Sequence, residues 1–300
     1  MASGSKKVIY AAFVANLIIA VIKFIAAAMT GSSAMFSEGI HTTVDTSNQL
    51  LLLLGLKKAT QPADENHPFG YGKEIYFWSF IVAIMVFAVG AGISIYEGIH
   101  SILDPHPIEN VMISYGVLGF AIIATGIAWY LALKEFSRTK GDRGFFEAVH
   151  KEKNPSTFVV LFEDSAALLG LFVALAGIGL SQWTGNPIFD GIASVVIGLI
   201  LGTTASWLAY ETKGLLIGES ADPKVVEGIK QLVGSYQEIT SVNETLTLHM
   251  GPNYIVLNIS VNFKDELHAD QIERTIEDLT SRIKEKYPRV NRIFIEAEDV

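Results

Sequence analysis

The sequence predicts an α-helical polytopic membrane protein, with six transmembrane helices in residues 1–210 and a water-soluble α+β domain in residues 211–300. Half of the residues are apolar and only 18% are charged, whereas a soluble domain carries about 25% charge. The charges are also unevenly spread. Residues 211–300 hold 10 of the 22 Lys or Arg residues and 16 of the 31 Asp or Glu residues. Long apolar stretches fill most of the remainder. Together these observations predict a membrane domain followed by an acidic soluble domain.

Six apolar stretches have the length of a membrane span, which requires about 20 mostly apolar residues. They cover residues 8–29, 33–56, 75–99, 111–133, 157–182 and 188–209. The seven residues MASGSKK before the first stretch are too short for a cleavable signal peptide. We therefore interpret them as an N-terminal segment ahead of the first span.

The basic residues between the stretches predict the topology. They fall only before span 1, between spans 2 and 3, and between spans 4 and 5: Lys6, Lys7, Lys57, Lys58, Lys73, Lys134, Arg138, Lys140, Arg143, Lys151 and Lys153. The connections near Gly31, at 104–109 and at 183–187 contain neither Lys nor Arg. Because positively charged loops stay in the cytoplasm, both termini and the acidic domain are predicted to be cytoplasmic.

The C-terminal domain reads as helix, hairpin, helix and strand. Asp222 and Pro223 are suited to begin the first helix, as its cap and its first residue. The predicted elements are a helix at 223–233, strands at 244–249 and 254–263, a helix at 268–286 and a strand at 290–297. This order indicates a small ferredoxin-like α+β domain.

Composition excludes several classes of function. The chain has no cysteine, so a disulfide scaffold, a thiolate metal site and a cysteine nucleophile are ruled out. Its formal charge of −9 argues against nucleic acid as a partner, because such binding needs a basic surface.

Ionisable residues within the apolar stretches are the candidate functional residues, since a charge at membrane depth is costly and usually marks an ion pathway. In span 2, His41 and Asp45 are four residues apart and share one helical face. Together they could bind a divalent ion after losing their protons. Span 5 carries Glu163 and Asp164 side by side, about 100° apart around a helix. The alternative is that these groups only stabilise a helix bundle or lie in water at a helix end.

On these residues the chain resembles the cation diffusion facilitator family. The similar features are six spans with an α+β tail, the His41-x-x-x-Asp45 pattern, the acidic pair of span 5, and the loop from Asp64 to Glu74. The resemblance implies a homodimeric, proton-coupled exporter of zinc or a related divalent ion, located in the inner membrane if the source is bacterial. It implies no cofactor, because the metal ion is the substrate.

The resemblance also implies where the metal binds. It places a tetrahedral transport site at His41, Asp45 and Asp164, with Gly170 fixing the register of span 5. Val160 stands where many members have a further His or Asp ligand, so Glu163 is the expected substitute. Glu38, Asn48 or a water molecule are lesser candidates.

A second, loop site is a weaker expectation. Members with such a site use an Asp and two His residues at the positions of Asp64, His67 and Tyr71. Tyr71 replaces the last of these ligands here. A solvated turn ahead of span 3 is an equally good interpretation of Asp64 and His67.

Two classes besides the transporter stay open from the sequence. An intramembrane metal-dependent hydrolase could use the same residue types, although no HExxH or nucleophile-elbow motif occurs in the chain. A membrane-tethered metal sensor would leave the buried charges without a role. Within the transporter class, zinc, manganese, cobalt and iron all suit a mixed His and carboxylate site.

Overall fold

Long helices make up most of the chain in the computed structural model, which describes residues 2–140 and 155–299. Helix α1 (Ala2–Thr30) and helix α2 (Ser33–Ala59) are joined by a very short turn. Gly31 adopts a left-handed φ of 68° there, and its N–H donates to the Ala27 carbonyl at 2.8 Å. Glycine reaches this conformation without steric cost, so it ends α1 and lets α2 begin two residues later.

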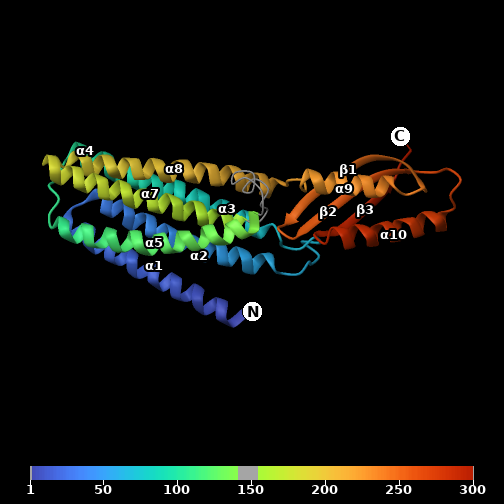
Figure 1. Cartoon of the computed structure of the whole chain (residues 1–300), viewed down its shortest axis with the longest axis horizontal. Helices are drawn as coiled ribbons and strands as arrows, with labels where there is room; N and C mark the ends of the chain where they lie inside the picture. The colour runs from blue at the N-terminus through green and yellow to red at the C-terminus, as the bar shows by residue number, and fades with distance from the viewer. Residues whose placement is uncertain (1, 141–154, 300) are drawn as a thin grey trace. The chain divides into compact units, whose positions relative to one another are not determined.

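Further helices follow α2 in the described part of the chain (Figure 1). Helices α3 (Glu74–Met85) and α4 (Gly92–Leu103) continue one another through a π-helical segment, η1 (Val86–Ala91). Helices α5 (Val111–Lys140), α7 (Pro155–Thr184) and α8 (Ile188–Ile217) follow. Arg143, Lys151 and Lys153, which contributed to the topology prediction, lie outside the described residues.

Among the described residues, four helical runs are long and apolar enough to cross a membrane. They are Glu74–Leu103, Val111–Lys134, Phe158–Thr184 and Ile188–Ile217, which coincide with predicted spans 3 to 6. The described part of α1 contributes a shorter apolar run, Asn16–Thr30. Many outward side chains of these helices are apolar, as in the stripe of Ile123, Ile127 and Leu131 on α5. Such surface is costly in water but suits lipid.

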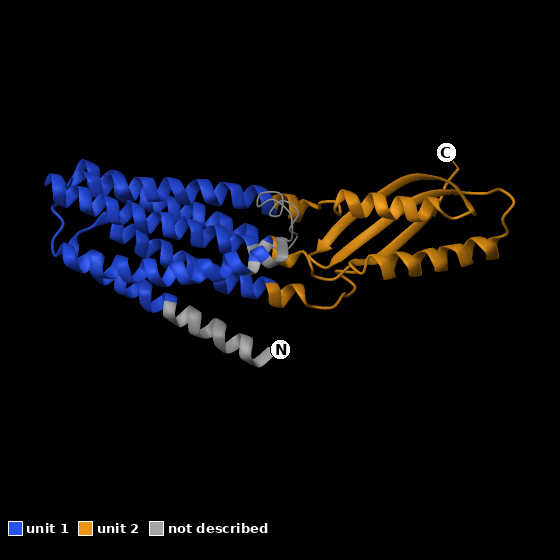
Figure 2. Cartoon of the chain, viewed as in Figure 1, with its two compact units in different colours: residues 1–55, 77–212 blue, residues 56–76, 213–300 orange. Residues whose placement is uncertain are grey.

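The chain forms two compact units (Figure 2). The first comprises residues 1–55 and 77–212, and the second comprises residues 56–76 and 213–300. The core of the first unit is built mostly from small and branched apolar side chains, among them Ala34, Leu118, Leu171, Ile197 and Leu201.

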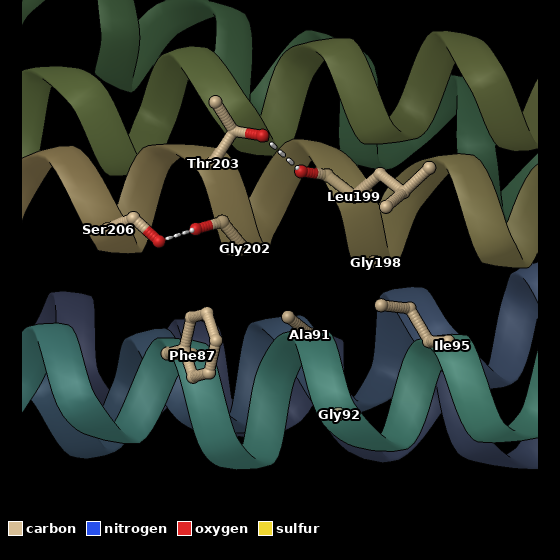
Figure 3. Close-up of a pocket in the computed structure, with 9 residues that line it drawn as sticks. All are labelled: Phe87, Ala91, Gly92, Ile95, Gly198, Leu199, Gly202, Thr203 and Ser206. Carbon is tan, nitrogen blue, oxygen red and sulfur yellow. Dashed lines mark hydrogen bonds between the residues drawn. The ribbon is translucent and has the colours of Figure 1, made fainter.

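Helices α4 and α8 approach closely because glycines line their contact. A Cβ atom on Gly198 would lie 2.6 Å from the Ile95 side chain, and one on Gly98 would lie 2.6 Å from the Val195 backbone nitrogen. Small residues permit such contacts between membrane helices. Beside the contact, η1, α4 and α8 leave a pocket of about 410 Å³ (Figure 3). Its lining residues are Phe87, Ala91, Gly92, Ile95, Gly198, Leu199, Gly202, Thr203 and Ser206.

Asp190, in the first turn of α8, caps the beginning of α2. Its carboxylate accepts hydrogen bonds from the Ser33 and Ala34 backbone N–H groups at 2.6 and 3.3 Å, and from the hydroxyls of Ser32 and Ser33 at 2.7 and 3.0 Å. The first N–H groups of a helix lack intrahelical partners and favour negative charge. The cap therefore fixes α2, the helix of His41 and Asp45, against α8.

The second unit holds the α+β elements. They are α9 (Pro223–Gly234), β1 (Ile239–Gly251), β2 (Tyr254–Phe263), α10 (Ala269–Lys286) and β3 (Val290–Ala297). Strand β2 is central, antiparallel to β1 and parallel to β3. Its alternate residues Ile255, Leu257, Ile259 and Val261 are buried, in one core with apolar residues of both helices. Asp222 caps α9 as predicted, accepting from the Lys224 N–H at 2.9 Å.

Strand β1 begins earlier than the sequence predicts. The prediction began it at residue 244, whereas the structure begins it at Ile239. The added residues, Thr240 to Asn243, are mostly polar, so they lack the apolar alternation that indicates a strand. Register shifts on both sides of Ser241 and Val242 let β1 keep pairing with β2 despite this pattern.

Candidate functional site

Helix α2 places His41 and Asp45 together in the interior of the first unit. The His41 Nδ1 atom lies 3.4 Å from Asp45 Oδ1, and the two side chains are 2% and 21% exposed. Both ring nitrogens of His41 and the Oδ1 atom of Asp45 are buried without a hydrogen-bond partner. Buried polar atoms are normally satisfied. These unsatisfied nitrogen and oxygen atoms are suited to ligate a divalent cation.

Helix α7 directs its two adjacent acids to different surroundings. Asp164 lines a cavity of about 500 Å³ together with Asp45, whereas Glu163 is not part of that lining. The Glu163 Oε1 atom instead accepts a hydrogen bond from the Asn48 amide of α2 at 2.7 Å. This divergence follows from the roughly 100° turn between successive helical residues.

The cavity that contains Asp45 and Asp164 lies among α1, α2, α5 and α7. Its polar lining consists of Asn16, Lys23, Thr42, Asp45, Gln49, Thr125 and Asp164, and its apolar lining of Ile19, Ala124, Ala128, Ala132, Val160 and Ala167. Val160 thus faces the same cavity as the two carboxylates. Two acids from different helices therefore share one enclosure, which can receive a small cation.

The candidate ligands do not form a compact metal cage. Within residues 2–140 and 155–299, no group of three or more His, Asp or Glu side chains is close enough together to hold a metal ion. The structure brings together His41 with Asp45, Asp45 with Asp164 in the cavity, and Glu163 with Asn48. A metal ion bound by His41, Asp45 and Asp164 would thus require these three side chains to come closer together.

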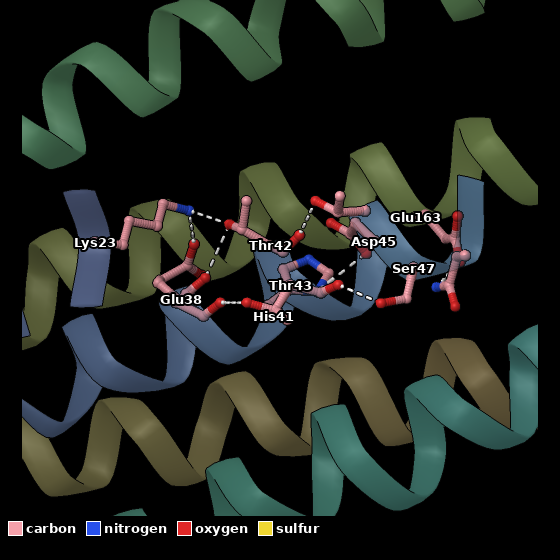
Figure 4. Close-up of polar contacts among 11 residues, drawn as sticks. Lys23, Glu38, His41, Thr42, Thr43, Asp45, Ser47 and Glu163 are labelled. Carbon is pink, nitrogen blue, oxygen red and sulfur yellow. Dashed lines mark hydrogen bonds and ion pairs between the residues drawn. The ribbon is translucent and has the colours of Figure 1, made fainter. Parts of the chain in front are cut away.

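A buried lysine beside this site was missed by the sequence interpretation. Lys23 of α1 is 3% exposed, and its Nζ atom contacts Glu38 Oε2 at 2.9 Å and Thr42 Oγ1 at 2.8 Å (Figure 4). The available signal was a single lysine within the apolar stretch 8–29. Glu38, a lesser candidate for metal ligation, is therefore engaged by an ammonium group.

The loop residues Asp64 and His67 are arranged as a hydrogen-bonded turn. Asp64 Oδ1 accepts from the His67 N–H at 2.7 Å, and Asp64 Oδ2 accepts from the Tyr71 hydroxyl at 2.7 Å. The Tyr71 hydrogen bond, followed by that from the His67 backbone, lowers the pKa of Asp64. Asp64, His67 and Tyr71 are thus held together by hydrogen bonds in the turn ahead of α3.

Comparison with known proteins identifies the family. The cation efflux transmembrane domain matches residues 9–217, which is more than half of the chain. The protein therefore belongs to the cation efflux family, and its homologues are transporters rather than enzymes. The apolar helices agree with a membrane protein of this kind.

Three relatives illustrate the range of similarity. The mouse mitochondrial proton-coupled zinc antiporter SLC30A9 is 34% identical over 87% of this chain and 46% of its own length. The metal tolerance protein C4 of Arabidopsis thaliana is 26% identical over 88% of this chain and 58% of its own. The chain thus spans about half the length of these relatives. The manganese efflux system protein MneP of Bacillus subtilis is 22% identical over 97% of this chain and 95% of its own length.

Proposed function

We propose that this protein is a proton-coupled antiporter that exports zinc, or a related divalent cation, from the cytoplasm. The observation that carries the proposal is the buried His41–Asp45 pair on α2, with Asp45 sharing a cavity with Asp164 of α7. The 34% identity to a protein named a proton-coupled zinc antiporter supports zinc as the substrate.

The proposed transport site consists of His41, Asp45 and Asp164, with Glu163 as a further ligand. Nitrogen and oxygen donors of this kind bind zinc at about 2.0–2.2 Å. Glu163 would have to exchange its hydrogen bond from Asn48 for the metal ion. In the loop, Asp64 and His67 are a weaker candidate site, because Tyr71, which donates a hydrogen bond to Asp64, stands where the resemblance implies a third ligand.

Proton coupling follows from competition for the same ligands. Metal ions bind neutral imidazole and ionised carboxylates, so binding a metal displaces protons and binding protons displaces the metal. When the site faces the cytoplasm, zinc displaces protons from His41 and the acids. When it faces the opposite side, protons displace the zinc.

The proposal includes the arrangement in the membrane. Helices α1 and α2 complete a set of six spans, with the division from the tail near residue 210 and both termini in the cytoplasm. The tail is a ferredoxin-like domain, and two copies of the chain form the transporter. In a bacterial source, the membrane would be the inner membrane.

A flux assay in proteoliposomes with a pH gradient tests this proposal. Losing a group that only supports a metal ligand typically costs roughly 10- to 100-fold in metal affinity or activity. Loss of a ligand itself in His41→Ala, Asp45→Ala or Asp164→Ala should therefore reduce zinc flux by at least about 100-fold. Thr43→Ala is the control, because Thr43 is exposed and its hydroxyl donates to the Gly39 carbonyl one turn earlier on the same helix. Undiminished flux in His41→Ala and Asp45→Ala would contradict the site.

Manganese is the second candidate substrate. The similarity to a Bacillus subtilis protein named for manganese efflux extends over nearly the full length of both chains. Carboxylate and water ligands suit manganese, whereas the imidazole of His41 favours zinc. Parallel flux measurements with zinc, manganese, cobalt and iron decide between the candidate substrates. A larger flux of manganese than of zinc would identify manganese, rather than zinc, as the preferred substrate.

A further inference from the structure

The ion pair between Lys23 and Glu38 is buried in the interior of the first unit. The two side chains are 4% and 0% exposed, and the Lys23 Nζ atom lies 2.9 Å from Glu38 Oε2. Burying two charges is costly, and replacing such a pair by apolar residues often stabilises a protein. A buried ion pair is therefore weak evidence for a stabilising role. Its position relative to Asp45 suggests another function.

Glu38, Thr42 and Asp45 form one stripe along α2 that faces Lys23. Residues three and four apart are neighbours on a helix surface, with Cβ atoms about 5–6 Å apart. The Lys23 ammonium contacts Glu38 and Thr42, and Lys23, Thr42, Asp45 and Asp164 all line the same cavity. An ammonium group has three donors, of which the described contacts use two. One donor is therefore unassigned among the described contacts, and Asp45 lines the same cavity as the ammonium group.

Helix α7 leaves room for the Glu38 carboxylate. A Cβ atom on Gly170 would lie 2.5 Å from Glu38 Oε1, so any larger residue at position 170 would displace this carboxylate. Glycine thus permits the position from which Glu38 binds Lys23. The ion pair is built by three helices, α1, α2 and α7.

We propose that Glu38 is a positioning residue that holds the Lys23 ammonium away from Asp45 and Asp164, so that both carboxylates remain available to a divalent cation. Without Glu38, Lys23 would pair with one of these acids and act as a tethered cation in competition with the metal. This inference rests on the proposed transport site. It assigns to Glu38 a role other than metal ligation.

The substitution Glu38→Gln removes the charge that retains Lys23 and keeps the shape of the side chain. A tethered group acts at a local concentration on the order of millimolar or above, so the ammonium competes effectively with zinc. This competition should raise the KM for zinc roughly 10- to 100-fold, the range seen when a group that supports a metal ligand is lost. Saturating zinc displaces a competitor, so the maximal flux should stay near that of the wild type. A lower maximal flux at unchanged KM would contradict the proposal.

The double variant Lys23→Met/Glu38→Gln provides the decisive rescue. It removes the competing ammonium, so its KM for zinc should return to within about threefold of the wild-type value. That difference is much smaller than the roughly 10- to 100-fold rise expected from Glu38→Gln alone. If Glu38 were a metal ligand, the double variant would keep the raised KM. That result would overturn the inference while leaving the proposed transport function in place.

A measurement in metal-free protein tests the same inference independently of transport. The melting temperature is determined in detergent with a chelator for Glu38→Gln and Lys23→Met/Glu38→Gln, each with and without Asp45→Asn. We expect Asp45→Asn to lower the melting temperature in Glu38→Gln, where Asp45 has gained the ammonium as a partner. It should not do so in the double variant. Equal effects of Asp45→Asn in the two backgrounds would overturn the inference, even if the protein transports no zinc.

Discussion

Val160 determines how many ligands the cavity of Asp45 and Asp164 offers. Its side chain lines the cavity with both carboxylates, at the position where the family resemblance implies a further His or Asp. At the proposed transport site, an apolar residue at this position would leave a metal ion with fewer protein ligands. The affinity of the proposed site for a metal ion should therefore be lower with valine than with a ligand at position 160. Release of the metal ion should be correspondingly faster.

A histidine at position 160 should strengthen metal binding. Val160→His adds an imidazole one helical turn from Asp164, on the same face of α7. We expect zinc affinity, measured by calorimetry in detergent, to increase by roughly tenfold or more. Changes of single groups around a metal typically alter its affinity by this amount. Val160→Leu is the matched control, because it changes size without adding a ligand. Equal affinities of the two variants would show that position 160 does not reach the metal.

At the scale of elements, the beginning of α2 depends on α8 as much as on its own sequence. Ser32 and Ser33 supply hydroxyls at this helix start, yet the backbone N–H groups of Ser33 and Ala34 bind Asp190 of α8. A second link lies nearby, where the Ser37 and Ser194 hydroxyls are 2.5 Å apart and Ser194 donates to the Ser94 carbonyl at 2.8 Å. Helix α2 is thus fixed to α8 near its first turn.

Replacing Asp190 should destabilise the protein. Asp190→Ala leaves two backbone N–H groups and two hydroxyls without their acceptor, and each unsatisfied buried group costs about 1–3 kcal/mol. We expect a lower melting temperature in detergent. Asp104→Ala is the control, because the Asp104 side chain is 72% exposed and lies at the end of α4. An unchanged melting temperature of Asp190→Ala would mean that solvent or lipid replaces the cap.

At the scale of the whole molecule, the loop before α3 belongs with the tail. Residues 56–76 form one compact unit with residues 213–300. Gly72 packs directly on the end of the β1–β2 hairpin, where a Cβ atom would overlap the carbonyl oxygen of Met250. Only glycine allows this contact between two backbones. Lys73 adds a hydrogen bond to the Leu216 carbonyl at 3.5 Å.

Gly72→Ala should loosen the loop without unfolding either unit. The new methyl group meets backbone atoms, which cannot rotate away as a side chain can. Hydrogen exchange of residues 56–76 should therefore become faster, whereas that of β2 should not change. Gly234→Ala serves as the control, because its Cβ atom would meet the nearest described atom at an ordinary 4.0 Å. Exchange as slow as in the wild type would contradict the packing argument.

The elements of the tail could be predicted closely because local signals define them. Asp222 and Pro223 begin α9, and alternating apolar residues define β2 from Tyr254 to Phe263. The beginning of β1 could not be predicted, since Thr240 to Asn243 have no apolar alternation, and Ser241 and Val242 pair only because β2 lies beside them. The parallel pairing of β2 with β3 likewise depends on contacts between distant residues.

The candidate site was only partly accessible to sequence reasoning. The spacing of His41 and Asp45 predicts their shared face, because helical geometry alone sets it. Asp190 lies in the first turn of α8, yet its carboxylate caps α2, and no local signal in the sequence indicates this partner. Lys23 was overlooked because its partners, Glu38 and Thr42, lie 15 and 19 residues away on another helix.

By itself, the sequence determined the apolar helices and the acidic α+β tail and indicated the residues proposed to bind a metal, because composition, periodicity and helical spacing are local properties. Only the tertiary structure decided which of those residues meet. It separated Glu163 from Asp164, placed Val160 in the cavity, and paired Lys23 with Glu38. The physical reason is that a side chain's partners across helices depend on how the helices rotate and pack, which no spacing along one helix specifies.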